Sequence, residues 1–281
     1  MNRSFKVLPH EAIFGGFLLI TWIRLGLGPG FGDRDALLYL ALILVDLALI
    51  GWCRHRPDRT RWTLRLLFHP MALNVVFLNM KEAIPKIAPD GMDRVLQRVD
   101  ALLVGGNLSL RLERFTTPSA SEWFSFCYIL FFPYLLFSLI WYFRRELDML
   151  RPFLVGLFTI YGLGFLGYSL VPAKGPWMAM TDQFRVPLAG GFITRLNDQV
   201  VRAGSNGVDV FPSLHCAVSS FLLGWDWRKT RWRFWAYLVP CVGLWFSTLY
   251  LRYHYLVDLL CGFILSAFAI WLARNFEQRG E

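Results

Sequence analysis

The stretch PSLHCAVSSFLLGWDWRKTRWRFWAYLVPCVGLWFSTLYLRYHYLVD, residues 212–258, predicts two neighbouring helices that run in opposite directions. Two apolar runs, 212–228 and 234–251, flank a short basic turn. An antiparallel helix pair brings the start of its first helix beside the end of its second. His215 and His254 should therefore lie at the same end of the pair, although they are far apart in the chain.

The rest of the chain has the composition of a membrane protein. Of its 281 residues, 56% are hydrophobic and only 17% are charged, against roughly 25% charged residues in soluble domains. A helix needs about 17–25 mostly apolar residues to cross a bilayer. We therefore expect an all-α, polytopic helical bundle, one integral membrane domain over residues 1–281, with about eight transmembrane helices. The candidate spans are 11–28, 36–53, 63–80, 123–143, 152–171, 212–228, 234–251 and 254–273.

The positions of the basic residues predict how the chain is oriented. A net charge of +9 can indicate a nucleic-acid partner, but here Lys and Arg form short clusters between apolar runs, as in cytoplasmic loops. With eight crossings and a cytoplasmic N-terminus, fifteen Lys and Arg fall inside and two in the short outside loops. We therefore expect both termini in the cytoplasm, the long loops 81–122 and 172–211 outside, and no nucleic-acid partner. The weakest span is 63–80, which contains Arg65 and Pro70.

The first long loop contains an amphipathic segment. Apolar residues recur at helical spacing between Met92 and Leu103. Such a helix can lie on the outer membrane surface and guide a substrate. It can equally pack as a cover over the ends of the membrane helices, and the sequence leaves both alternatives open.

Two pairs of residues at the predicted outer face can carry chemistry. Ser213 follows a proline and opens an apolar run, as a helix N-cap does, and helix N-termini bind phosphate. His215 follows two residues later. His254 and Asp258 are spaced i and i+4, so the carboxylate can orient the imidazole and leave its other nitrogen free to attack. The alternatives are a capped helix with an interfacial histidine and a structural His–Asp pair.

A third candidate lies at the outer end of the fifth span. The sequence VPAKGPW, residues 171–177, places Lys174 between residues that favour irregular backbone. A lysine there can offer a point charge to a phosphate. In isolation, a lysine anchored at the headgroup level beside Trp177 is the simpler interpretation.

Together these residues resemble the type 2 phosphatidic acid phosphatase superfamily, whose members have a six-helix membrane core. Residues 212–215 match its Pro-Ser-x-His motif, and His254 with Asp258 match the end of its Ser-Arg-x5-His-x3-Asp motif. The resemblance covers roughly 124–273. It implies that residues 63–273 form the catalytic core and 1–62 a two-helix extension.

The resemblance also implies catalytic roles without a metal or another cofactor. His254 would form a phosphohistidine, His215 would protonate the leaving group, and Asp258 would orient His254. Ser213 and Lys174 would hold phosphate oxygens. The implied substrate is a phospholipid or lipid phosphate at the non-cytoplasmic face.

Two departures from the family motifs bear on the reaction. Where the first motif expects Arg-Pro, this chain has Thr181-Asp182, and where the third expects arginine, it has Thr248. Arg252 can supply the missing charge as a phosphate-binding residue. The run from Ser247 to Asp258 looks more like the inositol phosphorylceramide synthase branch, which transfers a phosphoalcohol group to a lipid hydroxyl.

Three functions remain open from the sequence. Water attacking the phosphohistidine would give a phosphatase, and a lipid or sugar hydroxyl would give a transferase; the phosphatase is the broader prediction and the inositol-phosphate-type transferase its alternative. A transporter without chemistry is the third, with Arg24 and Asp46 pairing across neighbouring helices as relay residues.

Aromatic residues near the outer face can line a lipid path or form an interfacial belt. They are Trp123, Tyr168, Trp177, Trp245, Tyr250, Tyr253 and Tyr255. No oligomeric state is predicted.

Overall fold

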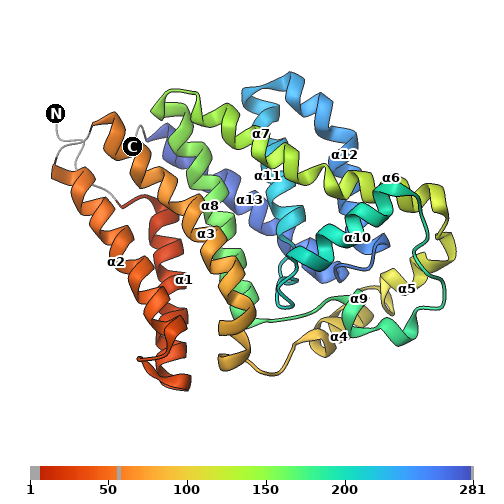
Figure 1. The fold of residues 1–281 in the computed structure, drawn as a ribbon. Coiled ribbons are helices and arrows are strands. Elements are labelled where there is room, and N and C mark those ends of the chain that lie inside the picture. Colours follow the sequence, from red (N-terminus) through yellow and green to blue (C-terminus); the bar gives the residue numbers. More distant parts are fainter. Residues whose placement is uncertain (1–6, 56–57, 280–281) are drawn as a thin grey trace.

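The computed structural model describes residues 7–55 and 58–279, and in these residues all regular structure is helical (Figure 1). This confirms the all-α class. The helices are α1 (Pro9–Leu25), α2 (Arg34–His55), α3 (Arg59–Ile87), α4 (Asp93–Val104), α5 (Leu108–Leu112), α6 (Pro118–Ile129), α7 (Phe131–Phe143), α8 (Leu147–Leu170), α9 (Pro176–Ala179), α10 (Phe192–Gly204), α11 (Leu214–Lys229), α12 (Arg231–Tyr250) and α13 (Leu256–Gln278).

Six helical segments of the described chain are long and apolar enough to cross a membrane, so the protein is a polytopic membrane protein. They are Pro9–Gly30, Arg34–His55, Arg59–Ile87, Pro118–Phe143, Leu147–Leu170 and Leu256–Gln278. The weakest predicted span, 63–80, thus lies within a 29-residue helix. The two remaining predicted spans form α11, which has only 16 residues, and α12, which has 20. Eight crossings therefore remain a prediction.

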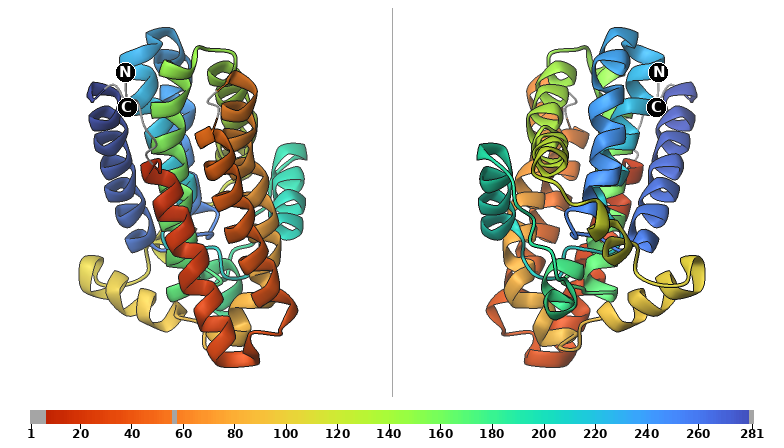
Figure 2. Two further views of the ribbon diagram at one scale, coloured as in Figure 1. Left: turned by 90° about the vertical axis from the view of Figure 1, so that its left-hand side faces the viewer. Right: turned by 90° about the vertical axis from the view of Figure 1, so that its right-hand side faces the viewer.

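Helix α8 is the centre of the bundle. It packs against α1, α3, α7, α11 and α13, and in the left-hand view of Figure 2 it runs between α13 and the helices α2 and α3. Small residues on α8 allow this close packing. A Cβ atom on Gly156 would lie 2.2 Å from the ring of Phe221, and one on Gly164 would lie 2.3 Å from Leu214. Both contacts are with α11, so glycines on α8 set how closely α11 approaches.

The segments that connect the helices lie at the two ends of the bundle. The α7–α8 and α11–α12 turns lie at one end, and α4, α5 and α9 lie toward the other (Figures 1 and 2). The first of these ends carries the basic turns, with Arg144 and Arg145 in one and Lys229 and Arg231 in the other. The basic turns are thus separated from the parts of the long loops that form α4, α5 and α9, whereas α10 of the second long loop packs beside α6 (Figures 1 and 2).

The amphipathic segment of the first long loop forms α4, as predicted, but its polar face is the one that packs inward. Asp93 and Asp100 are buried together with Leu96, whereas Leu102 is 87% exposed. Asp93 accepts a hydrogen bond from the backbone N–H of Lys174, and Asp100 accepts one from the first N–H of α13. The side of α4 that carries Asp93, Leu96 and Asp100 therefore packs over the helix ends, whereas the side that carries Val95, Leu102 and Leu103 faces outward.

The buried charges of α1–α3 are arranged differently from the predicted Arg24–Asp46 pair, which is wrong. Arg24 donates to the backbone and hydroxyl oxygens of Ser169, at 2.8 and 2.6 Å. Asp46 lies 3.9 Å from His69 instead. The two predicted partners are separated because α1 and α2 run in opposite directions, with Arg24 at the end of α1 and Asp46 in the second half of α2.

A buried ion pair holds the basic turn of the α11–α12 hairpin. Nε of Arg233 donates to Asp226 at 2.9 Å, and both side chains are almost fully buried. Tyr134 and Tyr142 of α7 donate to the same carboxylate, each at 3.0 Å. The ion pair therefore ties the hairpin to α7 at the end opposite the two motif histidines.

Removing the arginine should destabilise the protein strongly. We expect Arg233→Met to lower the free energy of unfolding by about 3–5 kcal/mol, because Asp226 would remain buried without its cation. The double variant Asp226→Asn/Arg233→Met should recover part of this loss. Thermal denaturation of the purified variants in one detergent measures both effects. Equal melting temperatures for the wild type and Arg233→Met would contradict this role.

Candidate active site

The first site histidine lies at the start of α11. Ser213 is the N-cap of this helix, and its hydroxyl accepts a hydrogen bond from the N–H of Cys216 at 3.4 Å. His215 follows in the first turn, with its Nδ1 3.4 Å from the hydroxyl of Tyr128. Its ring packs among aromatic rings that include Phe131. The local sequence thus forms the capped helix start that was predicted.

The second site histidine lies in the turn between α12 and α13. The backbone carbonyl of Thr248 accepts hydrogen bonds from the N–H groups of Tyr253 and His254, at 2.9 and 3.1 Å. Nδ1 of His254 lies 3.4 Å from Oδ2 of Asp258. The same carboxylate oxygen accepts the N–H of Tyr255 at 2.8 Å, which fixes the first turn of α13. Asp258 therefore faces Nδ1 and leaves Nε2 of His254 as the nitrogen able to attack.

Backbone contacts join these two sequence motifs directly. The N–H of Ser213 donates to the carbonyl oxygen of Asp258 at 3.0 Å. Gly262 of α13 lies against the carbonyl of Ser213, where an added Cβ would come within 2.6 Å of that oxygen. The rings of His215 and His254 lie 6.0 Å apart, centroid to centroid. The predicted meeting of the two histidines at one end of the hairpin is thus present.

The loop with Lys174 lies against the turn that carries His254. The N–H of Trp177 donates to the carbonyl of Arg252 at 2.8 Å, and a Cβ on Gly175 would lie 2.3 Å from the carbonyl oxygen of Tyr253. Gly175 also has a φ of +79°, which favours glycine. The loop backbone is therefore part of the site, whereas the side chain of Lys174 is exposed.

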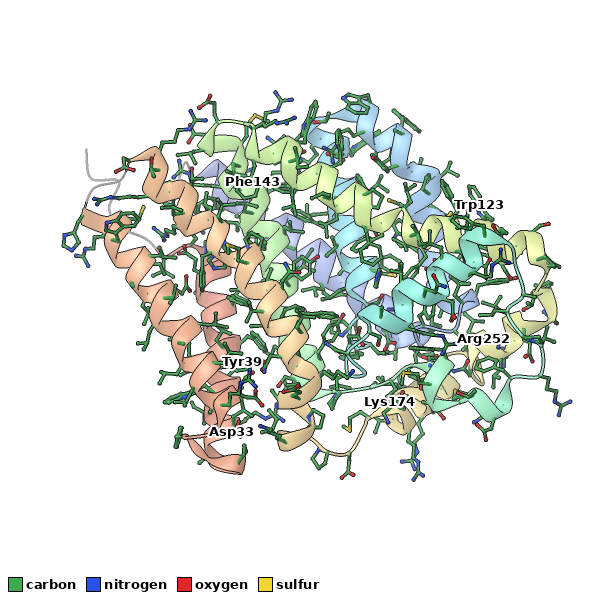
Figure 3. The ribbon with its side chains drawn as sticks, viewed as in Figure 1. Asp33, Tyr39, Trp123, Phe143, Lys174 and Arg252 are labelled. Carbon is green, nitrogen blue, oxygen red and sulfur yellow. The ribbon has the colours of Figure 1, made fainter. Side chains whose placement is uncertain are left out.

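The side chain of Arg252 contacts groups outside the cavity. Its Nη2 donates to the carbonyl of Val186 at 2.5 Å and lies 3.5 Å from Glu113. Its guanidinium also stacks on the ring of Phe184. Lys174 and Arg252 both lie at the loop end of the bundle (Figure 3), but neither lines the cavity that the histidines face. The structure thus brings together the histidines, Asp258 and Ser213, but not the two cations.

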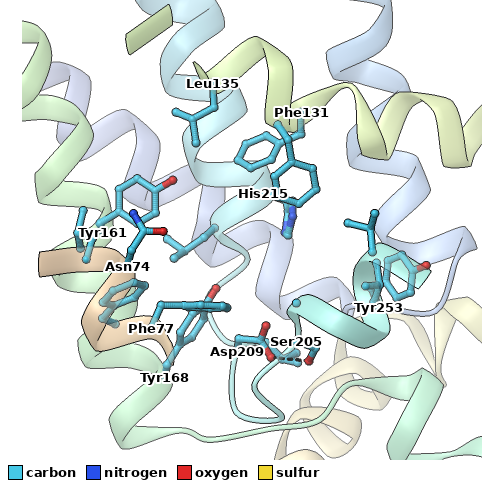
Figure 4. Close-up of a pocket in the computed structure, with 18 of the residues that line it drawn as sticks. Asn74, Phe77, Phe131, Leu135, Tyr161, Tyr168, Ser205, Asp209, His215 and Tyr253 are labelled. Atoms are coloured by element: carbon cyan, nitrogen blue, oxygen red, sulfur yellow. Dashed lines mark hydrogen bonds between the residues drawn. The ribbon is translucent and has the colours of Figure 1, made fainter. Parts of the chain in front are cut away.

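A cavity of about 410 Å³ opens beside the two histidines. Its walls come from α3, α6, α7, α8, α10 and the loop before α11, and most of the lining side chains are apolar or aromatic (Figure 4). Of the predicted outer-face aromatics, Tyr168, Trp177 and Tyr253 line it. The space can therefore hold the hydrocarbon part of a lipid beside the imidazoles.

The sequence reasoning missed three carboxylates near the site. Asp93 accepts hydrogen bonds from the N–H of Lys174 and the hydroxyl of Tyr255, at 3.0 and 2.9 Å. Asp100 accepts the N–H groups that open α13, and its burial raises the pKa of that carboxyl. Asp209 lines the cavity itself. The two carboxylates of α4 have i, i+7 spacing on its polar face, a signal that could have been read.

The arrangement suits nucleophilic chemistry assisted by a second imidazole. One histidine is backed by a carboxylate, and the other stands across from it in the same cavity. A phosphorus atom between two such rings can be attacked by one and have its leaving oxygen protonated by the other. Among residues 7–55 and 58–279, no group of three or more His, Cys, Asp or Glu forms a metal site.

Comparisons with known proteins place this geometry in context. The family model described as the PAP2 superfamily matches residues 94–272. Phosphoinositol dihydroceramide synthase of Bacteroides thetaiotaomicron is 30% identical over 152 residues, which is 49% of this chain and 50% of that protein. Inositol phosphorylceramide synthase of Candida albicans is 31% identical over 191 residues, which is 62% of this chain and 40% of that protein. The chain thus spans half or less of these relatives. No solved structure matches it.

The contact at Gly262 predicts a sensitive position. Gly262→Ala should reduce turnover roughly tenfold or more, because its Cβ would press on the backbone of Ser213 and move His215 relative to His254. Gly224→Ala is the matched control on the same α11–α13 interface, since its Cβ would meet only the flexible end of Ile270. Initial rates of the two variants at equal folded concentration make the comparison. Equal rates would show that this contact does not control the position of His215 relative to His254.

Proposed function

Because the chain belongs to the PAP2 superfamily, we propose that it is a lipid phosphotransferase that moves an inositol-phosphate-type head group from a phospholipid to a lipid hydroxyl. The observation that carries the proposal is the pair of histidines, one backed by Asp258, facing one largely apolar cavity. The names of the two relatives favour transfer over hydrolysis.

The proposed reaction has two steps. Nε2 of His254 attacks the phosphorus of the donor lipid, the bond from phosphorus to the diacylglycerol oxygen breaks, and His215 gives that oxygen a proton. The acceptor hydroxyl then attacks the phosphohistidine, the phosphorus–nitrogen bond breaks, and His215 takes the hydroxyl proton. Both histidines return to their starting protonation states.

The phosphate-binding groups belong to this proposal as well. Ser213 sits at the N-terminus of α11, where free N–H groups favour an anion. Lys174 is exposed on a loop whose backbone touches the His254 turn, so its side chain can swing toward a bound phosphate. Arg252 would have to release Val186 and Glu113 to do the same.

The site is proposed to open on the non-cytoplasmic face. The basic turns lie at one end of the bundle and the site loops at the other. Short loops rich in Lys and Arg stay on the cytoplasmic side. Both termini would then be cytoplasmic, with eight crossings that include α11 and α12.

Product analysis tests the reaction. Purified protein is given phosphatidylinositol labelled in its inositol, with or without ceramide as acceptor. We expect a new labelled lipid only when the acceptor is present. Water-soluble label that forms equally without any acceptor would make the protein a hydrolase.

Two histidine variants complete this test. His254→Ala should lower turnover about a thousandfold or more, because the nucleophile is lost. His55→Ala is the control, since His55 is exposed at the end of α2. Rapid transfer by His254→Ala would overturn the assignment of the nucleophile.

A further inference from the structure

The cavity contains a polar group that the proposed reaction does not use. Asp209 and Ser205, from the loop that joins α10 to α11, line the cavity together with the two histidines. The hydroxyl of Ser205 donates to Oδ1 of Asp209 at 2.9 Å. Figure 4 shows this pair on one side of the cavity and His215 on the other.

The charge of Asp209 defines what can bind beside it. In the part of the chain that the structure describes, no Lys or Arg forms an ion pair with this carboxylate. Burial raises the pKa of Asp209, and the nearby His254 imidazole lowers it by less. A carboxylate repels the phosphate of the donor lipid. When ionised, it is purely a hydrogen-bond acceptor, so it suits a substrate O–H or N–H group.

The surroundings of Asp209 favour the lipid acceptor over the polyhydroxylated head group. An inositol ring would need several polar partners, whereas the cavity around Asp209 offers Ser205 and the phenol of Tyr168 and is otherwise lined mainly by apolar side chains such as Phe77 and Val210 (Figure 4). A lipid acceptor offers one or two hydroxyl or amide donors on an apolar body. That combination matches one carboxylate in an aromatic cavity.

We propose that Asp209, with Ser205, binds the polar end of the acceptor lipid and holds its reactive hydroxyl toward His254. This inference rests on the proposed transferase function and adds the residue that recognises the acceptor. An acceptor held in this way also displaces water from the phosphohistidine. Asp209 would therefore favour transfer over hydrolysis.

The variant Asp209→Asn tests the inference, because it keeps the shape of the side chain and removes its charge. Transfer is measured at varied acceptor and at varied donor concentrations, together with water-soluble head-group release. We expect the KM for the acceptor to rise roughly tenfold, a smaller change in the KM for the donor, and a larger share of hydrolysis. Asp198→Asn is the matched control, since Asp198 is exposed on α10 and pairs with Arg202.

The outcomes separate the two proposals. A rise in the KM for the donor with the KM for the acceptor unchanged would place the head group beside Asp209 and overturn the inference. An unchanged KM for the acceptor with unchanged partition would overturn it as well. Failure of the wild-type protein to transfer any head group would instead overturn the proposed function on which the inference rests.

Discussion

The site depends on one backbone hydrogen bond, from the N–H of Ser213 to the carbonyl of Asp258. This bond joins the start of α11 to the start of α13. It can form because Gly262 has no Cβ and lets the backbones of these two segments come into contact. The histidines on either side of it then share one cavity. Displacing either helix start would separate the imidazoles, whatever the stability of the rest of the bundle.

Helix α4 supports that junction from outside the bundle. Asp100 accepts the first two N–H groups of α13, and Asp93 holds the backbone of the Lys174 loop. Carboxylates near free N–H groups at a helix start are stabilising. The apolar side of α4 is left exposed at the loop end of the bundle, where a bilayer surface can cover it. One amphipathic helix therefore positions two site loops through its polar face.

Much of the fold and of the site could be predicted from the sequence, because long apolar runs and i, i+4 spacing are local signals. Six of the eight predicted spans coincide with helices long and apolar enough to cross a membrane, and His215 meets His254 as predicted. The partners of Arg24 and Arg252 could not be predicted, because they depend on how distant segments pack. Asp209 was missed because a lone acidic residue in a loop gives no periodic pattern. The six candidate spans also exclude α11, whose 16 residues are short for a crossing.

The central claim is that His254 carries the transferred group, and trapping the intermediate tests it most directly. The protein would be mixed with inositol-labelled phosphatidylinositol without an acceptor, quenched under alkaline conditions that preserve phosphohistidine, and digested for mass spectrometry. The account predicts an inositol-phosphoryl group on the peptide that contains His254. The same group on the peptide with His215, or on a residue outside the cavity, would contradict it.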